Sequence, residues 1–94
     1  MPDPTTLALG PELTIAYAAE AHATLTQALQ AAPGPLMLDL SAVAEFDSAG
    51  VQLLLATQRS LAARGQALKL SRPSDVVQDA LRVFGLTPLF EAVA

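Results

Sequence analysis

Short apolar segments alternate with longer segments of helical periodicity along this chain, and the alternation constrains the fold more than any other feature. The short segments are TLAL (6–9), LMLDL (36–40) and ALKL (67–70), and each has the length of a strand. In the longer segments apolar residues recur every three to four positions, as in helices that pack by one face. An alternating order requires crossover connections, so it predicts an α/β domain with a largely parallel sheet.

The first two expected helices have clear start and stop signals. The first begins near Thr14, which suits a cap, and ends at Ala32 before the PGP turn. The second begins at Asp47 or Ser48 and ends before Gly65, which suits a left-handed C-terminal cap. The apolar face of this second helix is expected to exclude Leu53 and to contain Val51, Leu54, Leu55, Leu61 and Ala62, with Gln58 as its one polar member.

The third helix is expected between Ser74, a good N-cap, and Gly85, with Asp75 in its first turn. Its apolar face consists of Val76, Val77, Ala80, Leu81 and Phe84. The chain then closes with a short segment that has a helical turn after Pro88. Because the strand at 36–40 is almost wholly apolar, we expect it to be buried on both faces, and we interpret residues 41–46 as a connecting loop.

Length and composition favour a single folded domain over residues 1–94. The chain is 52% hydrophobic and only 15% charged, which argues against disorder. The net charge of −4 and the scattered basic residues argue against nucleic-acid binding, because phosphates require a basic patch. There is no cysteine, and the single histidine, His22, has no further ligands at a useful spacing, so we expect no metal site.

The N-terminal sequence MPDPTTLALG has neither a basic region nor a long apolar region, so we expect no signal peptide. The apolar stretches are shorter than the ~20 residues of a membrane span. We therefore expect a cytoplasmic protein that does not insert into the membrane. The turns contain no phosphate-binding glycine motif, so we expect no nucleotide and no other cofactor.

The stretch AEFDSAGVQLLL (44–55) carries the most specific chemistry in the sequence. A serine before a glycine at a strand-to-helix turn is typical of the nucleophile of some hydrolases. That motif requires glycine two positions before the serine, where this chain has Phe46. A triad also requires a histidine, and His22 lies in the middle of the first expected helix. We therefore do not expect an enzyme.

Two other interpretations of Ser48 are compatible with each other. Asp47 or Ser48 caps the following helix, and Gly50 lets the first helical turn lie close to a neighbouring element. Ser48 is also suited to phosphorylation, because a serine at a helix start is exposed and backbone N–H groups there are free to bind phosphate oxygens. The added charge would repel an acidic partner or disrupt a packed contact.

The segment from LMLDLSAVAEFDSAG to VFGLTPLF, residues 36–90, resembles the STAS domain, the module of bacterial anti-sigma factor antagonists. The resemblance depends on the strand end LDLS, the turn DSAG, the glycine in RGQALKL and the closing VFGL. Before it, GPEL (10–13) loosely matches the glycine-containing turn of the family. The resemblance implies a four- to five-stranded mixed sheet with helices packed mainly on one side.

The resemblance also implies a function. In the antagonists, the serine after the aspartate is phosphorylated by an anti-sigma factor kinase, and the unphosphorylated form binds that kinase. In this chain that serine is Ser48. The resemblance thus implies a non-catalytic regulatory protein that binds a protein partner and is switched at Ser48. The implied partner-binding residues are Asp47, Ser48, Ala49, Gly50 and Gln52.

The chain departs from the antagonists in two ways. Few residues precede Gly10, so the usual first strand is short or missing, and Ala49 replaces a second serine. The alternative is therefore a STAS adaptor that binds the ATPase of a lipid-asymmetry ABC transporter, or a chemotaxis or sensor-kinase complex. In that alternative Ser48 serves only as a helix cap.

Two further polar residues have structural interpretations. We expect His22 to be partly buried or at the edge of its helix. We expect Asp39 to point outward at the end of its strand or to accept hydrogen bonds from the following loop, because an unpaired buried carboxylate is costly.

Overall fold

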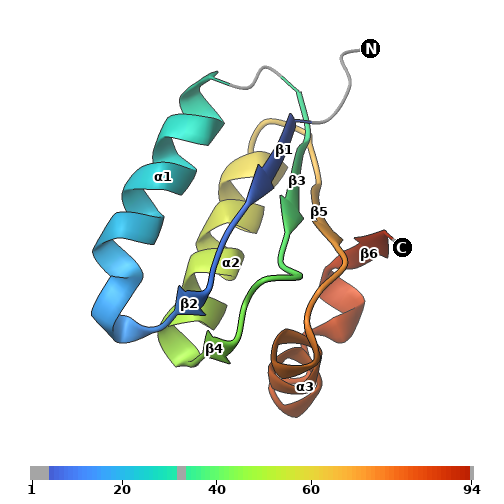
Figure 1. Ribbon diagram of the computed structural model, residues 1–94. Coiled ribbons are helices and arrows are strands. Elements are labelled where there is room, and N and C mark those ends of the chain that lie inside the picture. The colour runs from blue at the N-terminus through green and yellow to red at the C-terminus, as the bar shows by residue number, and fades with distance from the viewer. Residues whose placement is uncertain (1–4, 32–33, 94) are drawn as a thin grey trace.

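The computed structural model describes residues 5–31 and 34–93 (Figure 1). Over these residues the three expected strands and the three expected helices alternate as the sequence predicts, with three additional short strands and two 3-10 turns. The elements in order are β1 (Thr5–Ala8), β2 (Glu12–Leu13), η1 (Ile15–Tyr17), α1 (Ala18–Ala31), β3 (Leu36–Asp39), β4 (Glu45–Phe46), α2 (Ser48–Ala62), β5 (Leu68–Ser71), α3 (Asp75–Val83), η2 (Thr87–Leu89) and β6 (Glu91–Val93).

The main sheet has four strands in the order β1-β3-β5-β6. Each ladder formed by the described residues is parallel, so the alternating pattern predicted the strand directions better than the mixed sheet that the resemblance implied. The reason is that the chain passes through a helix or 3-10 turn between each strand of this sheet and the next. The strand β6 was not predicted from the sequence, which indicated only a helical turn in this segment.

The strands β1 and β2 form one path that bends in the middle. Gly10 has a φ of 136°, which redirects the chain after β1. As a result β1 pairs with β3, while β2 pairs with β4 in a separate two-stranded ladder. The strand β4 lies inside residues 41–46, the segment that was expected to be a loop. This second ladder brings the start of α1 next to the start of α2 (Figure 1).

The helices α1 and α2 lie side by side on one face of the sheet, and α3 packs against β4 and η2 (Figure 1). The strand β3 is therefore covered on one face only. Leu36 and Leu38 are fully buried, whereas Met37 and Asp39 are half-buried. The prediction that residues 36–40 are buried on both faces is wrong, because none of the helices in the described residues covers the second face.

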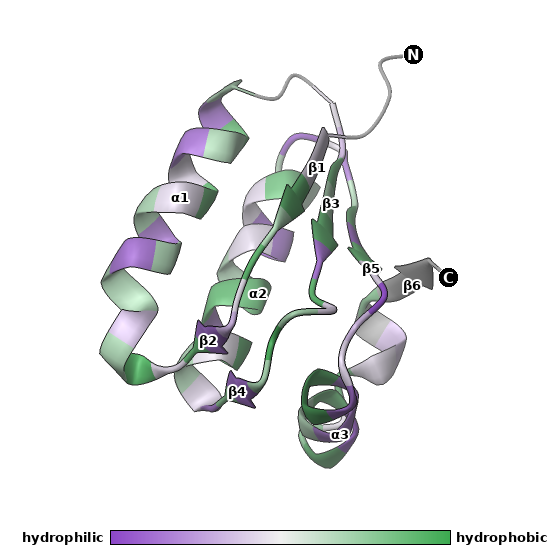
Figure 2. Ribbon diagram, viewed as in Figure 1, coloured by the Kyte–Doolittle hydropathy of each residue, from purple (hydrophilic) through white to green (hydrophobic). Residues whose placement is uncertain are grey.

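The core between the sheet and the helices is aliphatic, and hydrophobic residues concentrate on the facing sides of these elements (Figure 2). Its largest fully buried side chains are Leu13, Leu36, Leu38, Leu40, Leu54, Leu61, Leu70 and Val77. None of the helices in the described part of the chain is long and apolar enough to cross a membrane.

The first expected helix divides into η1 and α1, which ends at Ala31; residue 32 lies outside the described residues. Thr14 precedes η1, but it does not cap it. Instead its hydroxyl donates to Glu12 Oε2 at 3.2 Å. The start of α2 at Ser48 confirms the second helix, and its end is also confirmed, because Gly65 has a φ of 71° just after it.

The apolar face of α2 is wider than predicted. Leu53 is buried instead of lying off the face, and Thr57 is buried with its hydroxyl bonded to the carbonyl of Leu53 at 2.8 Å. Ala62 is exposed. The difference arises because α2 packs against both the sheet and α1, so that two sides of the helix are covered.

The third helix begins after Ser74 with Asp75 in its first turn, as predicted. The hydroxyl of Ser74, however, makes no cap hydrogen bond. Phe84 is 53% exposed instead of lying on the apolar face, because α3 ends at Val83 and the chain turns at Gly85, where φ is 70°. The turn η2 contains Pro88 instead of following it.

Candidate functional site

The carboxylate of Asp47 joins two elements of the fold. Its Oδ1 accepts hydrogen bonds from the backbone N–H groups of Ala49 at 2.9 Å and Gly50 at 3.4 Å, so Asp47 is the N-cap of α2. Its Oδ2 accepts the N–H of Ile15, at the start of η1, at 3.0 Å. The hydrogen bond from Ile15 is the largest cause of a lowered Asp47 pKa, and those from Ala49 and Gly50 add to it, against the opposing effect of desolvation.

Ser48 is the first residue of α2 and is exposed. Its hydroxyl makes no hydrogen bond within residues 5–31 and 34–93. The cap of the helix is therefore Asp47 and not Ser48. The expectation that free backbone N–H groups would receive a phosphate on Ser48 is also wrong for Ala49 and Gly50, because the Asp47 carboxylate already occupies both.

Gly50 is buried and is part of the first turn of α2. A Cβ at this position would lie 2.5 Å from the carbonyl oxygen of Leu13 and 2.7 Å from Cε1 of Phe46. The predicted close approach of the helix to a neighbouring element is thus present, and the neighbour is the β2–β4 ladder. Gly50 positions the site, whereas Ser48 and Gln52 present exposed side chains.

An open groove of about 880 Å³ lies between the starts of α1 and α2. Ser48 and Asp47 are at its rim, and both helices contribute mostly small apolar side chains to it. Its lining residues are Ile15, Ala18, Ala19, His22, Asp47, Ser48, Ala49, Gln52, Leu53 and Ala56. Of the five residues predicted to bind a partner, the groove includes all but Gly50.

His22 is exposed and lines this groove, so of its two expected positions the partly buried one is wrong. Among the described residues it forms no hydrogen bond with Ser48, although both line the same groove. A nucleophile and its base lie within hydrogen-bond reach in an acyl-transfer site, so the geometry gives no support to catalysis by Ser48. Within the described residues no three potential metal ligands come together.

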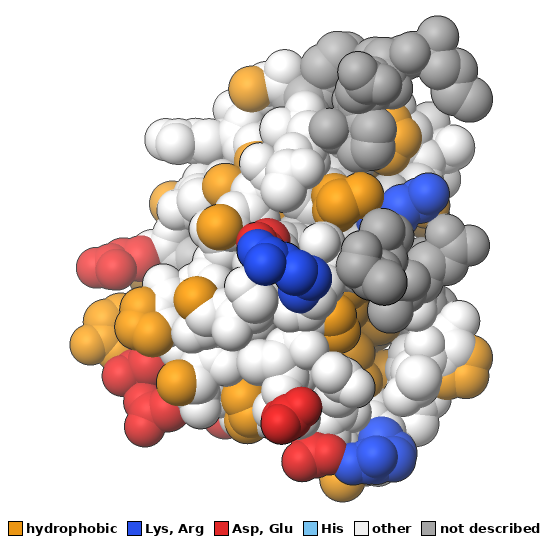
Figure 3. Space-filling model, turned by 45° about the vertical axis from the view of Figure 1, so that its right-hand side comes forward, with side chains coloured by type: hydrophobic (Ala, Val, Ile, Leu, Met, Phe, Trp, Pro, Cys, Tyr) orange, Lys and Arg blue, Asp and Glu red, His pale blue; other side chains and the backbone are white. Residues whose placement is uncertain are grey.

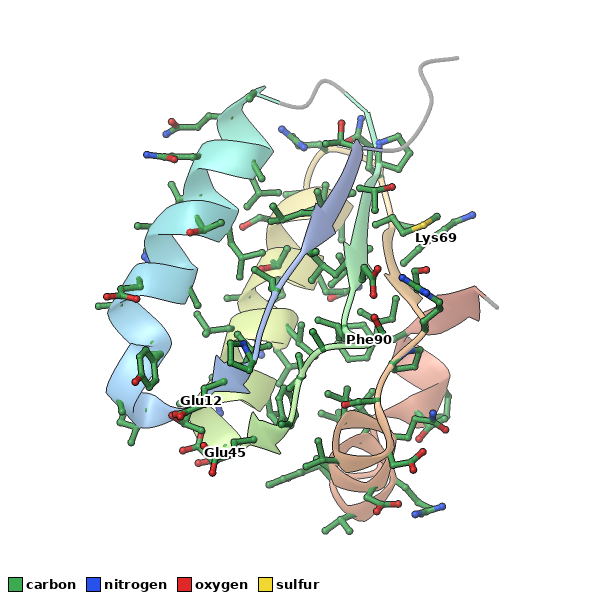
Figure 4. All side chains as sticks on the ribbon, in the orientation of Figure 1. Glu12, Glu45, Lys69 and Phe90 are labelled. Carbon is green, nitrogen blue, oxygen red and sulfur yellow. The ribbon has the colours of Figure 1, made fainter. Side chains whose placement is uncertain are left out.

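Two glutamates face each other next to the groove. Glu12 and Glu45 are partners in the β2–β4 ladder, and their side chains point out at the same end of the molecule (Figure 4). The hydrogen bond between the two side chains, followed by the repulsion between their charges, raises the pKa of Glu45. The end of the molecule that carries Ser48 is therefore acidic.

The comparisons with known proteins identify the family and agree with the fold. Residues 1–91 match the family described as "Mlab, STAS domain". The chain belongs to the STAS domain family. A comparison with curated protein sequences gives no significant match.

Solved structures place this STAS domain beside anti-sigma factor antagonists. It is similar to the antagonist SpoIIAA in its unphosphorylated form, with 26% identity and a TM-score of 0.77 over 95% of this chain and 78% of that chain. It is also similar to phosphorylated SpoIIAA of Bacillus, with 24% identity and a TM-score of 0.70 over 95% of this chain and 81% of that chain. A candidate antagonist from Thermotoga maritima shares the fold at 22% identity, with a TM-score of 0.80 over 93% of this chain and 77% of that chain.

In this STAS domain Asp39 belongs to a separate cluster of polar side chains at the ends of β3 and β5. Its Oδ1 accepts from the backbone N–H of Ser41 at 3.0 Å and from its hydroxyl at 2.7 Å. Arg72 donates to its Oδ2 at 2.6 Å. These contacts, with the Ser41 N–H as the largest, lower the pKa of Asp39 to about 2. Asp39 thus accepts hydrogen bonds from the following loop, which was one of its two expected roles.

Sequence reasoning located the α2 half of the site but not the α1 half. Ile15, Ala18 and Ala19 carry no motif, and their place in the groove depends on how α1 packs beside α2. The sequence shows Ile15 only as an apolar residue near the start of a helix, and its 77% exposure becomes visible only in the structure.

Proposed function

We propose that this STAS domain is a non-catalytic, cytoplasmic regulatory protein of the anti-sigma factor antagonist type. It binds a protein partner, a kinase-like anti-sigma factor, through the surface formed by Asp47, Ser48, Ala49 and Gln52 over the buried Gly50. Phosphorylation of Ser48 by that kinase abolishes the binding. Binding and release of the partner therefore depend on one side chain at the start of α2.

The observation that carries the proposal is the free, exposed hydroxyl of Ser48 beside an aspartate that already caps the helix. Because Asp47 satisfies the first N–H groups of α2, modification of Ser48 breaks no hydrogen bond within the described residues. A kinase can reach the hydroxyl without unfolding the helix. The similarity to SpoIIAA, whose structure is known in both unphosphorylated and phosphorylated forms, supports the same conclusion.

The phosphate would act at the contact surface and not on the fold. It adds about −1.5 to −2 charges at neutral pH, and the N–H groups of Ala49 and Gly50 are already bonded to Asp47. The phosphate therefore stays in solvent at the rim of an apolar groove. A partner that packs there would have to remove water from a doubly charged group, which costs more than the contact supplies.

A second candidate function is a constitutive adaptor on the ATPase of an ABC transporter of the lipid-asymmetry type, and the match to a family described as "Mlab, STAS domain" favours it. In that case the same surface binds the ATPase, and Ser48 is an unmodified surface residue. The two candidates use the same groove but differ in their partner and in the role of Ser48.

The test is affinity purification from the native cell with three baits: the parent, Ser48→Ala and Ser48→Asp. We expect the parent and Ser48→Ala to retain a kinase-like protein and Ser48→Asp to lose it at least about tenfold, because one desolvated charge at an interface costs several kcal/mol. Ser60→Asp, which places the same change farther along α2, is the matched control and should retain the partner.

Each alternative result has a distinct meaning. A transport ATPase retained equally by the three baits and by the Ser60→Asp control would support the adaptor and contradict the switch. Equal retention of a kinase by Ser48→Ala and Ser48→Asp would leave the partner in place and overturn the phosphorylation switch.

A further inference from the structure

The groove between α1 and α2 has the periodicity of a helix-packing seam. On its first side, formed by η1 and the start of α1, Ala18, Ala19 and His22 lie three, four and seven residues after Ile15. The second side has the same spacing, with Ala49, Gln52, Leu53 and Ala56. Residues at this spacing lie one above another on a helix face. The groove therefore runs along a seam about two turns long, and small side chains make up much of both walls.

Small side chains let another helix approach closely. Alanines at 18, 19, 49 and 56 leave room between α1 and α2 where larger residues would fill the seam. Farther along the same seam the free space falls to about 60 Å³, where Leu25, Leu29 and Thr57 close it. The open part is thus confined to the end that carries Ser48.

A large apolar side chain stands exposed at the mouth of the groove. Ile15 is 77% exposed although it lies beside the starts of both helices. With Ala18, Ala19, Ala49 and Leu53 it makes a contiguous apolar patch, and such a patch with a polar rim is typical of a contact surface. It forms one wall on which an apolar residue of a partner can pack.

The same end of the molecule is acidic. Glu12 and Glu45 lie opposite each other on β2 and β4, two or three residues before Ile15 and Asp47, which line the groove. Figure 3 shows acidic side chains with exposed hydrophobic side chains between them along its left edge. Two carboxylates held together repel each other and attract a cation. Arg59 and Arg64 lie toward the opposite end of α2.

We propose that this groove is the docking site for an amphipathic helix of the protein partner, with its apolar side on the α1–α2 seam and a lysine or arginine against Glu12 and Glu45. The proposal rests on the proposed function and names the contact that the partner makes. A helix in a groove is read by apolar residues at the spacing of its turns, which both walls match. Ser48 lies at the rim, so a phosphate there would oppose seating of the apolar side.

The test uses two synthetic helical peptides as probes. Both are alanine-based, about 15 residues long, with leucines on one side. One peptide has three lysines in its first turn, and the other has glutamates at the same positions. Each is titrated into ¹⁵N-labelled protein and followed by amide chemical shifts. We expect shifts at the groove residues, and about tenfold tighter binding of the lysine peptide at low salt.

Three variants sharpen the test. Replacing both Glu12 and Glu45 by glutamine should remove most of the preference for the lysine peptide. Ile15→Ser should weaken binding at least about fivefold, since it removes an apolar wall without burying a polar group. Val83→Ser is the matched control, because Val83 is 80% exposed and does not line the groove.

The proposal is overturned if neither peptide binds at millimolar concentration, or if the shifts map to Val83 and Phe84. It is also overturned if Ile15→Ser and Val83→Ser weaken binding equally. Groove shifts that appear on concentrating the protein alone, without peptide, would mean that a second copy of the chain occupies the site. These results do not depend on Ser48, so the groove and the phosphorylation switch can fail separately.

Discussion

Asp39 ends the strand β3, Asp47 follows the strand β4, and both accept backbone hydrogen bonds, but their surroundings differ in charge. Asp39 is matched by Ser41 and by the cation of Arg72, so that cluster is complete in itself. Asp47 binds only backbone N–H groups, and Glu12 and Glu45 lie near it. The charge of the Asp39 cluster is neutralised by Arg72 within the cluster. The surface around Asp47 keeps uncompensated charge, an apolar groove and a free serine. These properties are typical of a surface that binds another molecule.

Gly50→Ala should have the largest effect on stability of the variants compared. It disturbs the surroundings of Asp47 and leaves those of Asp39 unchanged. The new methyl group would meet the backbone carbonyl of Leu13, which cannot rotate away as a side chain can. We expect a loss of about 2–3 kcal/mol in the free energy of unfolding, measured with urea. Gly65→Ala is the control, because its Cβ meets open space and only its left-handed backbone opposes it, at about 1 kcal/mol. Equal stability of the two variants would contradict the close approach.

Asp47→Ala should have the next largest effect. It removes the cap of α2 and the connection to Ile15 together, and we expect the melting temperature to fall by roughly 5–8 °C. Asp47→Asn keeps an oxygen for the N–H groups of α2 and should recover part of that loss. If Asp47→Ala and Asp47→Asn lower the melting temperature equally, the negative charge of Asp47 stabilises the start of α2 and its role as a cap does not.

Asp39→Asn tests how much the cluster of Asp39, Ser41 and Arg72 contributes to stability. Because the pKa of Asp39 is lowered to about 2, its stabilising contribution is fully present above its ordinary value of 3.8 and is lost as the pH falls from 3.8 to about 2. We expect the variant to melt roughly 3–5 °C lower at pH 7 and to lose less stability than the parent through that acid window. Thermal unfolding from pH 7 to pH 2 measures both effects. Arg82→Gln, at an exposed pair with Asp79, should follow the parent.

Glu45→Gln should have the smallest effect, and of opposite sign. Because Glu12 raises the pKa of Glu45, the contribution of Glu45 is most favourable below its ordinary value of 4.5 and is lost as the pH rises through its raised value. The variant should therefore melt higher than the parent at pH 7, by roughly 1–3 °C, and equally below pH 4.5. Adding Glu12→Gln to Glu45→Gln should raise the melting temperature little further, because the repulsion between the two carboxylates is already removed. Additive gains would mean that the two carboxylates do not interact.

Local signals made part of the fold predictable. The start of α2 follows from Asp47 and its end from Gly65, because caps and left-handed turns depend on neighbouring residues alone. The strands β4 and β6 could not be predicted, since they have two and three residues and exist only because distant strands lie beside them. For the same reason the burial of Leu53 was missed, because it depends on α1.

The candidate site was also predictable only in part. The sequence identified Ser48 and the residues around it through a resemblance and a helix start. It did not identify Ile15, Ala18 or Ala19, because they reach the site only when α1 packs against α2. Which residue caps α2 was also open from sequence alone, since aspartate and serine are both good caps, and the hydrogen bonds of Asp47 decide it.

The most direct test of the account is the dissociation constant of the captured partner for the protein phosphorylated at Ser48, compared with the unmodified protein, by calorimetry at physiological salt. Thermal unfolding of both forms serves as the control, because the phosphate is expected to leave the fold intact. The account predicts similar melting temperatures and binding at least about tenfold weaker for the phosphorylated form. Equal dissociation constants for the two forms would contradict it.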